Sequence, residues 1–461
     1  MIFVIKILSH FRERFVRIFS NLIYLAFGIL IGQEPMVKIP SIESSIVLDS
    51  LYNKKAYDSN IALVYNLKRF QLNPDYSIYS IVENRKYIDS LVIDGVINIQ
   101  NPIMDRIIAP LKSNPINNGF ENIKKNWVQR YYFFRREPLI ELGLIDENHL
   151  GAILQFSPEF ESYFSGIFGL SQQGKNWYLN GEIDLHFENL IQTAGILDFY
   201  WKRTDSLSQS IQFEILEPHP FGWELGTHIR YHHEIMSGLY TIIKTESMLR
   251  LYSPWVGHLN LGFTSGRTHP TKIGQISGFE KVWFKALSIS KNTDTRNQRY
   301  LPTKGKKINI SIDAGLQKKT EYIETEFDIQ QYFEIWKKFN VMLRLQGKGL
   351  HDFQVIIPKS RYMIYGGSGT LRGFKEQNFS APQFQVGTIE LNYKPVNIIQ
   401  TGIFIDCGTD KLNLFNNNNN VGYGLGFTQV TNKTIIKIQY AMAKGQNFSD
   451  GKLHINWISR I

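Results

Sequence analysis

The stretch WYLNGEIDLHFE, residues 177–188, alternates apolar and polar side chains without a break. Its odd positions carry Trp, Leu, Gly, Ile, Leu and Phe, and its even positions carry Tyr, Asn, Glu, Asp, His and Glu. Successive side chains of a β-strand point to opposite faces, so this pattern predicts a strand with one apolar and one hydrophilic face. Such a strand suits a wall between lipid and an aqueous lumen.

The same alternation recurs from about residue 159 to residue 461. The clearest repeats are residues 308–313, 323–329, 339–346, 389–393 and 436–440. Each of these repeats lies in a strand-like stretch of about ten residues, the length that a tilted transmembrane strand needs. We expect about eleven strands before the glycine-rich segment near Gly366 and about five after it. The predicted fold is therefore an all-β transmembrane barrel of about 16 antiparallel strands, an even number as in bacterial barrels.

A soluble β-sandwich would also show alternation. It accounts less well for so many long strands in series with Tyr, Trp and Phe near their ends. Hydrophobic residues make up 43% of the chain, yet the mean hydropathy is only −0.21. Apolar and polar residues thus alternate at short range, as in transmembrane barrels, whose mean hydropathy is low because lipid-facing and lumen-facing residues alternate along each strand.

The net charge of +10 is spread along the whole chain without a dense basic tract. A nucleic-acid partner is therefore not indicated, because no basic stripe or recognition-helix pattern accompanies the charge. The single cysteine, Cys407, excludes an internal disulfide framework and a cysteine-rich zinc site.

Residues 1–33 have the layout of a signal peptide. Four basic residues, the last of them Arg17, precede an apolar run at residues 22–31 that is too short to span a bilayer comfortably. An uncleaved membrane anchor is the alternative. No later apolar run reaches the length of a spanning helix, so membrane residence would depend on strands.

Between residues 87 and 156 the periodicity changes. A strand-like run at 87–94 is followed by two stretches with helical spacing, at 103–111 and 120–131, and by two short strands at 138–142 and 149–156. The order β-α-α-β-β predicts a small α+β domain over residues 87–156, in front of a barrel over residues 157–461. Residues 34–86 form an N-terminal segment with helical pieces such as 61–72, and whether it is a second, degenerate domain of the same kind stays open.

The glycine-rich segment GGSGTLRGF, residues 366–374, departs from the alternating pattern and allows an unusual backbone path. Here the chain resembles the Omp85 superfamily, whose sixth extracellular loop folds into the barrel and carries an Arg-Gly-Phe or Arg-Gly-Tyr tip. The domain at residues 87–156 likewise resembles a POTRA domain. The resemblance implies a loop-lock motif made of Gly367, Leu371, Arg372, Gly373 and Phe374.

Two further matches support the resemblance. Residues 404–408, Phe-Ile-Asp-Cys-Gly, look like the Phe-x-Asp-x-Gly strand of the family, and an acidic residue, Glu390, lies in the preceding strand. Alternation places Glu390, Phe404 and Asp406 on the lumenal face, and Ile389, Ile403 and Ile405 toward lipid. We expect Arg372 to lock the loop against Asp406, with Glu390 assisting, because a guanidinium in a lumen needs carboxylate partners. The predicted partners of the lock are Glu390, Phe404, Asp406 and Gly408.

The resemblance implies an outer-membrane protein with its soluble domain in the periplasm, acting in protein assembly, insertion or translocation. Its implied partners are the outer-membrane lipid bilayer, unfolded outer-membrane or exported client proteins, and periplasmic or lipoprotein accessory subunits. Two alternatives stay open: a two-partner secretion-type transporter for one exported protein, and a passive porin or structural barrel.

Barrel closure pairs every backbone group in lipid, so a weak seam between the first and last strands would be a template for incoming strands. The first strand is expected near 160–170 and the last near 453–460. The chain departs from most outer-membrane barrels in ending on isoleucine rather than on an aromatic residue. The predicted seam residues of the last strand are Leu453, Ile455, Trp457 and Ile461.

An enzymatic function is not expected. Residues 366–369 look like a nucleophile elbow around Ser368, but Thr370 occupies the position of the final glycine. The glycines of residues 422–426 sit in an alternating strand, where no helix follows to form a nucleotide loop. His232 and His233 point to opposite faces of a strand and cannot chelate one metal together. No cofactor, nucleotide or metal is implied.

Overall fold

The structure is a computed structural model. It describes residues 36–40, 65–72, 76–83, 87–95, 98–114, 120–134, 136–145, 150–173, 176–354, 356–411 and 419–461. The predicted signal peptide, residues 1–33, lies outside these residues. Two compact units divide the chain. The first comprises Met1–Val92, Leu111–Phe120 and Ile140–Ile153, and the second comprises Ile93–Pro110, Glu121–Leu139 and Leu154–Ile461.

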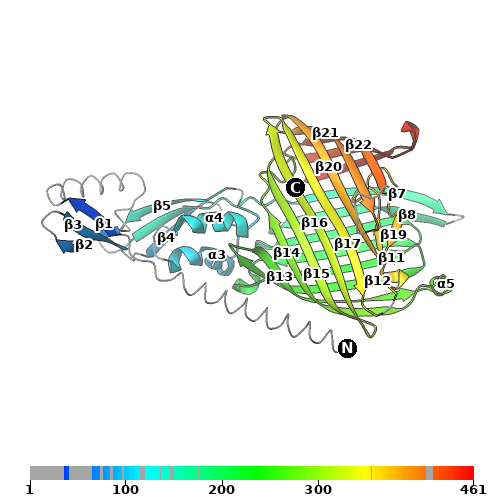
Figure 1. The fold of residues 1–461 in the computed structure, drawn as a ribbon, viewed down its shortest axis with the longest axis horizontal. Helices are drawn as coiled ribbons and strands as arrows, with labels where there is room; N and C mark the ends of the chain where they lie inside the picture. The colour runs from blue at the N-terminus through cyan, green and yellow to red at the C-terminus, as the bar shows by residue number, and fades with distance from the viewer. Residues whose placement is uncertain are drawn as a thin grey trace. The chain divides into compact units, whose positions relative to one another are not determined.

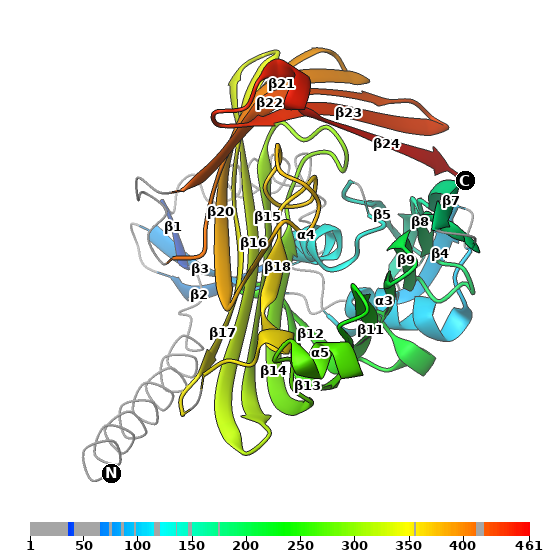
Figure 2. The ribbon, with the colours of Figure 1, turned by 90° about the vertical axis from the view of Figure 1, so that its right-hand side faces the viewer.

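Sixteen strands of the second unit close into an antiparallel barrel (Figures 1 and 2). Eleven precede the glycine-rich segment and five follow it, as the alternation predicted. The strands are β7 (Tyr163–Gln173), β8 (Asn176–Glu188), β9 (Ile196–Asp205), β10 (Ser208–Glu217), β11 (Gly226–Met236), β12 (Tyr240–Ser253), β13 (Gly257–Pro270), β14 (Val282–Asp294), β15 (Gly305–Gln317), β16 (Thr320–Trp336), β17 (Phe339–Asp352), β20 (Gln383–Val396), β21 (Ile399–Thr409), β22 (Asn420–Val430), β23 (Thr434–Ala443) and β24 (Lys452–Arg460).

The lumenal and outer faces follow the predicted alternation. On β21, Ile403 is 55% exposed on the outside, whereas its neighbour Phe404 is 6% exposed and Asp406 is fully buried in the interior. Ile405 and Ile389 are likewise exposed on the outer face. A slip of one residue would exchange the two faces, so the contrast between them specifies the register.

The element order ahead of the barrel is β-α-α-β-β, as predicted for residues 87–156. It consists of β4 (Ile88–Asp94), α3 (Asn101–Ser113), α4 (Phe120–Arg130), β5 (Leu139–Leu144) and β6 (Leu150–Gln155), and the sheet order is β4-β6-β5. No helix among the described residues is long and apolar enough to cross a membrane.

The helical interpretation of residues 61–72 is wrong where the structure describes them. Residues Tyr65–Leu72 form strand β2, which pairs with β3 (Tyr76–Glu83), and β3 also pairs with β1 (Met36–Pro40). Short apolar runs do not distinguish a strand from a helix by periodicity, and here the pairing with β3 decides for the strand.

A buried histidine joins the segment after α4 to a barrel turn inside the second unit. Burial lowers the pKa of His219 to about 4, so its ring is neutral at pH 7. Its Nδ1 donates to the carbonyl oxygen of Trp223 at 2.7 Å. Its Nε2 therefore accepts from the hydroxyl of Tyr131, which lies 2.7 Å away. This contact defines one end of the barrel, which we call the domain end, and the opposite end is the loop end.

The two faces of β21 generate a testable prediction. Ile403→Arg places a charge on the outer face and should lower the free energy of unfolding in lipid vesicles by about 2–4 kcal/mol. Gln400→Arg on the same strand is the control, because Gln400 lies an even number of residues from Phe404 and Asp406 and therefore shares their lumenal face. Urea titration of both variants measures the difference, and an equal loss would contradict the assignment of the faces.

Candidate functional site

The segment between β17 and β20 folds into the barrel. It carries a single turn of 3-10 helix, η3 (Lys359–Arg361), and two short paired strands, β18 (Met363–Tyr365) and β19 (Phe379–Ala381). Figure 2 shows β18 inside the ring of barrel strands. The glycine-rich motif lies between β18 and β19, so its tip is held within the lumen.

Arg372 makes the contacts that the sequence predicted. Its Nε and Nη2 donate to the two carboxylate oxygens of Asp406, both at 2.7 Å, and its Nη1 donates to Glu390 at 2.6 Å. Its backbone N–H donates to Asp406 at 3.1 Å, and its guanidinium lies 3.4 Å from the centre of the Phe404 ring. Strands β20 and β21 thus present two carboxylates and an aromatic face to a single arginine.

The electrostatics of this site follow from burial. Asp406 is fully buried and Arg372 is 6% exposed, and the hydroxyl of Thr388 donates a further hydrogen bond to Asp406 at 2.8 Å. A buried ion pair with all its hydrogen bonds made is tolerated, but removing one partner leaves an unpaired buried charge. The geometry therefore makes the two residues depend on one another.

Glycines allow the close approach of loop and wall. Gly373 has φ +90°, and a Cβ there would lie 2.5 Å from the backbone of Met442. On the wall, a Cβ at Gly422 would lie 1.9 Å from the carbonyl oxygen of Arg372. In the sequence Gly422 belongs only to an excluded nucleotide motif, because the contact with Arg372 depends on tertiary structure that alternation does not report.

The remaining predicted motif residues pack around the tip. Leu371 is fully buried in a cluster with Tyr365, Ala381 and Val386, against which Phe374 also packs. Gly408 leaves room for Leu371, because a Cβ on Gly408 would lie 2.8 Å from the Leu371 side chain. Gly367 adopts φ +96°, which favours glycine.

A second arginine of the same loop was not predicted. Arg361 is buried, and its Nη2 donates to Glu324 on β16 at 2.8 Å. Its guanidinium lies 3.6 Å from the centre of the Phe284 ring, and beside it Met363 packs against Phe284 and Tyr322. The loop is thus attached to the wall at two places, through Arg361 to β14–β16 and through Arg372 to β20–β21. Arg361 lies outside the glycine-rich motif, so nothing in the sequence indicated its contact with Glu324.

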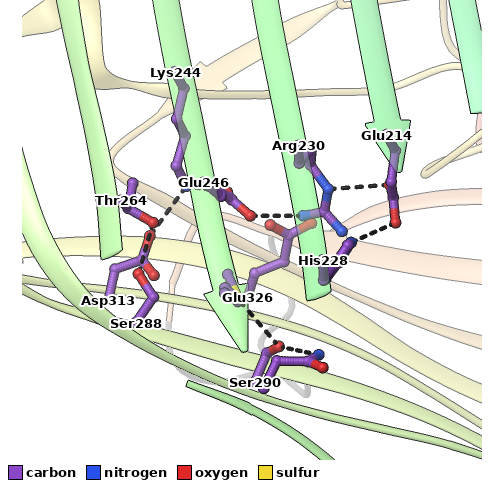
Figure 3. Close-up of polar contacts among 12 residues, drawn as sticks. Glu214, His228, Arg230, Lys244, Glu246, Thr264, Ser288, Ser290, Asp313 and Glu326 are labelled. Carbon is purple, nitrogen blue, oxygen red and sulfur yellow. Dashed lines mark hydrogen bonds and ion pairs between the residues drawn. The ribbon is translucent and has the colours of Figure 1, made fainter. Parts of the chain in front are cut away.

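Glu324 belongs to a network of charges on the lumenal wall. Lys244 lies 3.0 Å from Glu246, 3.1 Å from Asp313 and 3.5 Å from Glu324. The network continues from Glu246 through Arg230 to Glu214 and His228, each step between 2.7 and 3.1 Å (Figure 3). Alternation predicted lumenal polar faces, but only the register brings these opposite charges together.

Beside Arg372 the lumen holds a polar cavity of about 300 Å³. Arg344, Glu390, Lys437 and Asn456 are among the residues that line it. Ser368, the residue of the rejected nucleophile elbow, also borders the cavity, and its hydroxyl donates to Glu376 at 2.7 Å. The hydrogen-bond partner of the Ser368 hydroxyl is thus a carboxylate and not the histidine base that a nucleophilic serine needs.

The seam between the last and first strands is short. Among the described residues, strands β24 and β7 pair only at Ser459 with Phe164 and at Arg460 with Tyr163, and Ile461 N–H beyond β24 donates to the carbonyl oxygen of Ser162 at 2.9 Å, whereas β7 and β8 pair from Tyr163 to Gln173. The hydroxyl of Ser165 donates to the carbonyl of Trp457 at 2.8 Å, and Arg460 lies 3.3 Å from Glu161. Four predicted seam residues are exposed on this strand and at the chain end: Leu453, Ile455, Trp457 and Ile461.

A family model, the Omp85 superfamily domain, matches residues 189–457, which is more than half of the chain. The chain belongs to the Omp85 superfamily. Omp85 barrels are outer-membrane proteins of protein transport and assembly and are not enzymes. We expect the domain end of the barrel to face the periplasm and the loop end to face the cell exterior, as the resemblance implied. No match to this chain was found among curated protein sequences.

Solved Omp85 structures share the fold at low sequence identity. BamA from Haemophilus ducreyi lacking POTRA domains 1–3 is 13% identical with a TM-score of 0.51, covering 91% of this chain and 94% of that chain. CdiB from Acinetobacter baumannii is 13% identical with a TM-score of 0.54, covering 83% and 75%. CdiB from Escherichia coli is 12% identical with a TM-score of 0.55, covering 90% and 83%. At these identities the likeness establishes the fold alone.

The Arg372–Asp406 pair generates a second prediction. Arg372→Ala and Asp406→Ala should each lower the free energy of unfolding by about 3–5 kcal/mol, because each leaves the other charge buried and unpaired. The double variant should lose clearly less than the sum of the two single losses. Urea titration of the detergent-folded barrel measures all three values. Additive losses would show that the two side chains do not depend on one another.

Arg361 generates a third prediction. Arg361→Ala should increase proteolysis of the loop around η3 and β18 while lowering barrel stability less than Arg372→Ala does. The loss of stability should be smaller because the Glu324 carboxylate is not left unpaired when Arg361 is removed. Lys244 still lies 3.5 Å from it and Lys348 still lies 3.6 Å from it. Lys359→Ala, which removes an exposed cation of the same turn, is the matched control. Unchanged proteolysis in Arg361→Ala would contradict the second attachment.

Proposed function

We propose that this protein inserts or translocates other proteins at the outer membrane, using the edge of β24 as the template for an incoming strand. The observation that carries the proposal is the short seam between β24 and β7. Among the residues that the structure describes, Lys452–Ile458 pair with β23 but have no register partner on β7. Unpaired backbone groups in lipid are costly, so a client strand that pairs with them is stabilised.

The loop lock supports this function by keeping the lumen occupied. Arg372 holds the loop tip against β20 and β21, while Arg361 holds its entry segment against β14–β16. A lumen that contains a fastened loop is a poor passive channel. The locked loop therefore favours protein handling over the porin alternative.

The POTRA-like module supplies the receiving surface in this proposal. Its three-stranded sheet has the order β4-β6-β5, which leaves β4 and β5 at the edges. An extended client segment can add to such an edge through main-chain hydrogen bonds. Unfolded outer-membrane or exported proteins are the proposed clients, with periplasmic or lipoprotein accessory subunits as further proposed partners.

A two-partner secretion-type transporter is the second candidate. The observation that favours it is that the described residues contain one β-α-α-β-β module, since a transporter for one protein needs fewer receiving domains than a general assembly factor. In that case one exported protein would pass through the lumen, and the seam would stay closed. The two candidates therefore differ in whether β24 and β7 must separate.

Depletion followed by outer-membrane proteomics provides the fourth prediction. Loss of this protein should lower the abundance of many outer-membrane barrels, because each would need a seam at which to pair. Loss of one exported protein alone would support the secretion candidate. No change in either would contradict both.

A reversible lock of the seam sharpens the same experiment. Phe164→Cys and Ser459→Cys place two thiols on directly paired residues that both face outward. The oxidised double variant should fail to complement depletion if the seam must open, whereas each variant with only one of the two substitutions should complement it. Full complementation by the oxidised variant would contradict the seam mechanism and would support the second candidate, in which the exported protein passes through the lumen.

A further inference from the structure

Strands β13 and β14 build an ordered outer face near the loop end of the barrel. Their register pairs Leu261 with Ile289 and Phe263 with Leu287, and both pairs face outward. Phe263 is 67% exposed and Leu287 is 64% exposed. We call each such pair of directly opposite residues a rung, and these two rungs form a lipid-facing apolar surface.

The next two rungs toward the loop end carry cations. Ser265 pairs with Lys285, and Arg267 pairs with Trp283, with all four side chains exposed on the outer face. Arg267 and Lys285 are diagonal neighbours, a spacing that long side chains bridge. Lys281 lies just beyond Trp283 at the start of β14, also exposed.

Nearby carboxylates do not neutralise this pair. Within the described part of the chain, neither Arg267 nor Lys285 forms an ion pair. Glu280 is engaged by Lys318, and Glu321 lies on the outer face of β16 opposite Leu316. Like charges this close repel one another unless an anion lies between them.

We propose that the outer face of β13 and β14 binds a phosphate-bearing lipid of the outer leaflet, with Arg267 and Lys285 on the phosphate and Phe263 and Leu287 along the acyl chains. This surface is separate from the lumen, the loop lock and the seam. The proposal goes beyond the protein-handling function and does not depend on it.

The arrangement matches both halves of an amphiphile. A guanidinium and an ammonium are strong donors to phosphate oxygens, and the guanidinium offers two parallel hydrogen bonds. Trp283 is paired with Arg267 and lies two residues along β14 from Lys285, and an indole ring favours a membrane interface. The apolar rungs continue directly below on the same two strands. A soluble phosphate would use the cations but would gain nothing from Phe263 and Leu287, so a lipid is the better fit.

Binding of diphosphorylated lipid A to the full-length protein in nonionic detergent provides the fifth prediction, with native mass spectrometry as the readout. The double variant Arg267→Gln/Lys285→Gln should bind about 25-fold more weakly, from about fivefold for each cation near an anionic lipid surface. The charge-preserving variant Arg267→Lys/Lys285→Arg should retain binding within a few-fold.

The chain supplies a matched control on the same outer face. Lys291 on β14 and Lys306 on β15 point outward near the domain end, so Lys291→Gln/Lys306→Gln removes the same charge at the other side of the membrane. The control should bind lipid A like the unaltered protein. Heat-modifiable migration on gels verifies that each variant is folded, since all four substitutions lie on the barrel surface.

Three results would overturn the proposal. One is equal weakening in the control variant, which would indicate a general charge effect. Another is unchanged binding in Arg267→Gln/Lys285→Gln. The third is complete competition by inorganic phosphate at a concentration that does not disturb the micelles, which would indicate a simple anion site. None of these results bears on the depletion phenotype, so this proposal and the proposed function fail separately.

Discussion

Backbone hydrogen bonding around the ring of sixteen strands is the constraint on which the rest of this structure depends. A strand in lipid has no water to satisfy its N–H and C=O groups, so stability requires a partner on each side. Fifteen of the junctions between neighbouring strands supply long ladders, whereas β24 and β7 share only two residue pairs. The weakest part of the wall is therefore a defined place in the fold, and the proposed function uses it.

Closure of the ring creates a second requirement, because the enclosed charges need partners. The wall meets it with a network that runs from Glu214 through Arg230, Glu246 and Lys244 to Glu324. The loop enters this network through Arg361 and reaches a separate pair of carboxylates through Arg372. Attachment at two walls holds the loop across the lumen, which one ion pair at its tip would not do.

Much of the fold could be predicted because the alternation of apolar and polar side chains along a strand is a local property of the sequence. The strand count, the lumenal placement of Asp406 and the contact of Arg372 with Asp406 and Glu390 agree with the structure. Residues 65–72 were assigned wrongly, because a short apolar run reads alike in a helix and a strand until a pairing partner is known. Arg361 was missed for a related reason, since its partner Glu324 lies 37 residues earlier and in another element.

The sequence by itself determined which side chains face lipid and which face the lumen, because alternation along a strand needs no knowledge of its neighbours. It also determined that the glycine-rich loop carries an arginine suited to a carboxylate. Only the tertiary structure decided the pairing of charges across the wall, the second attachment of the loop and the cations above the apolar rungs of β13 and β14. Each depends on the register between strands, and register is a property of the closed ring rather than of any one segment.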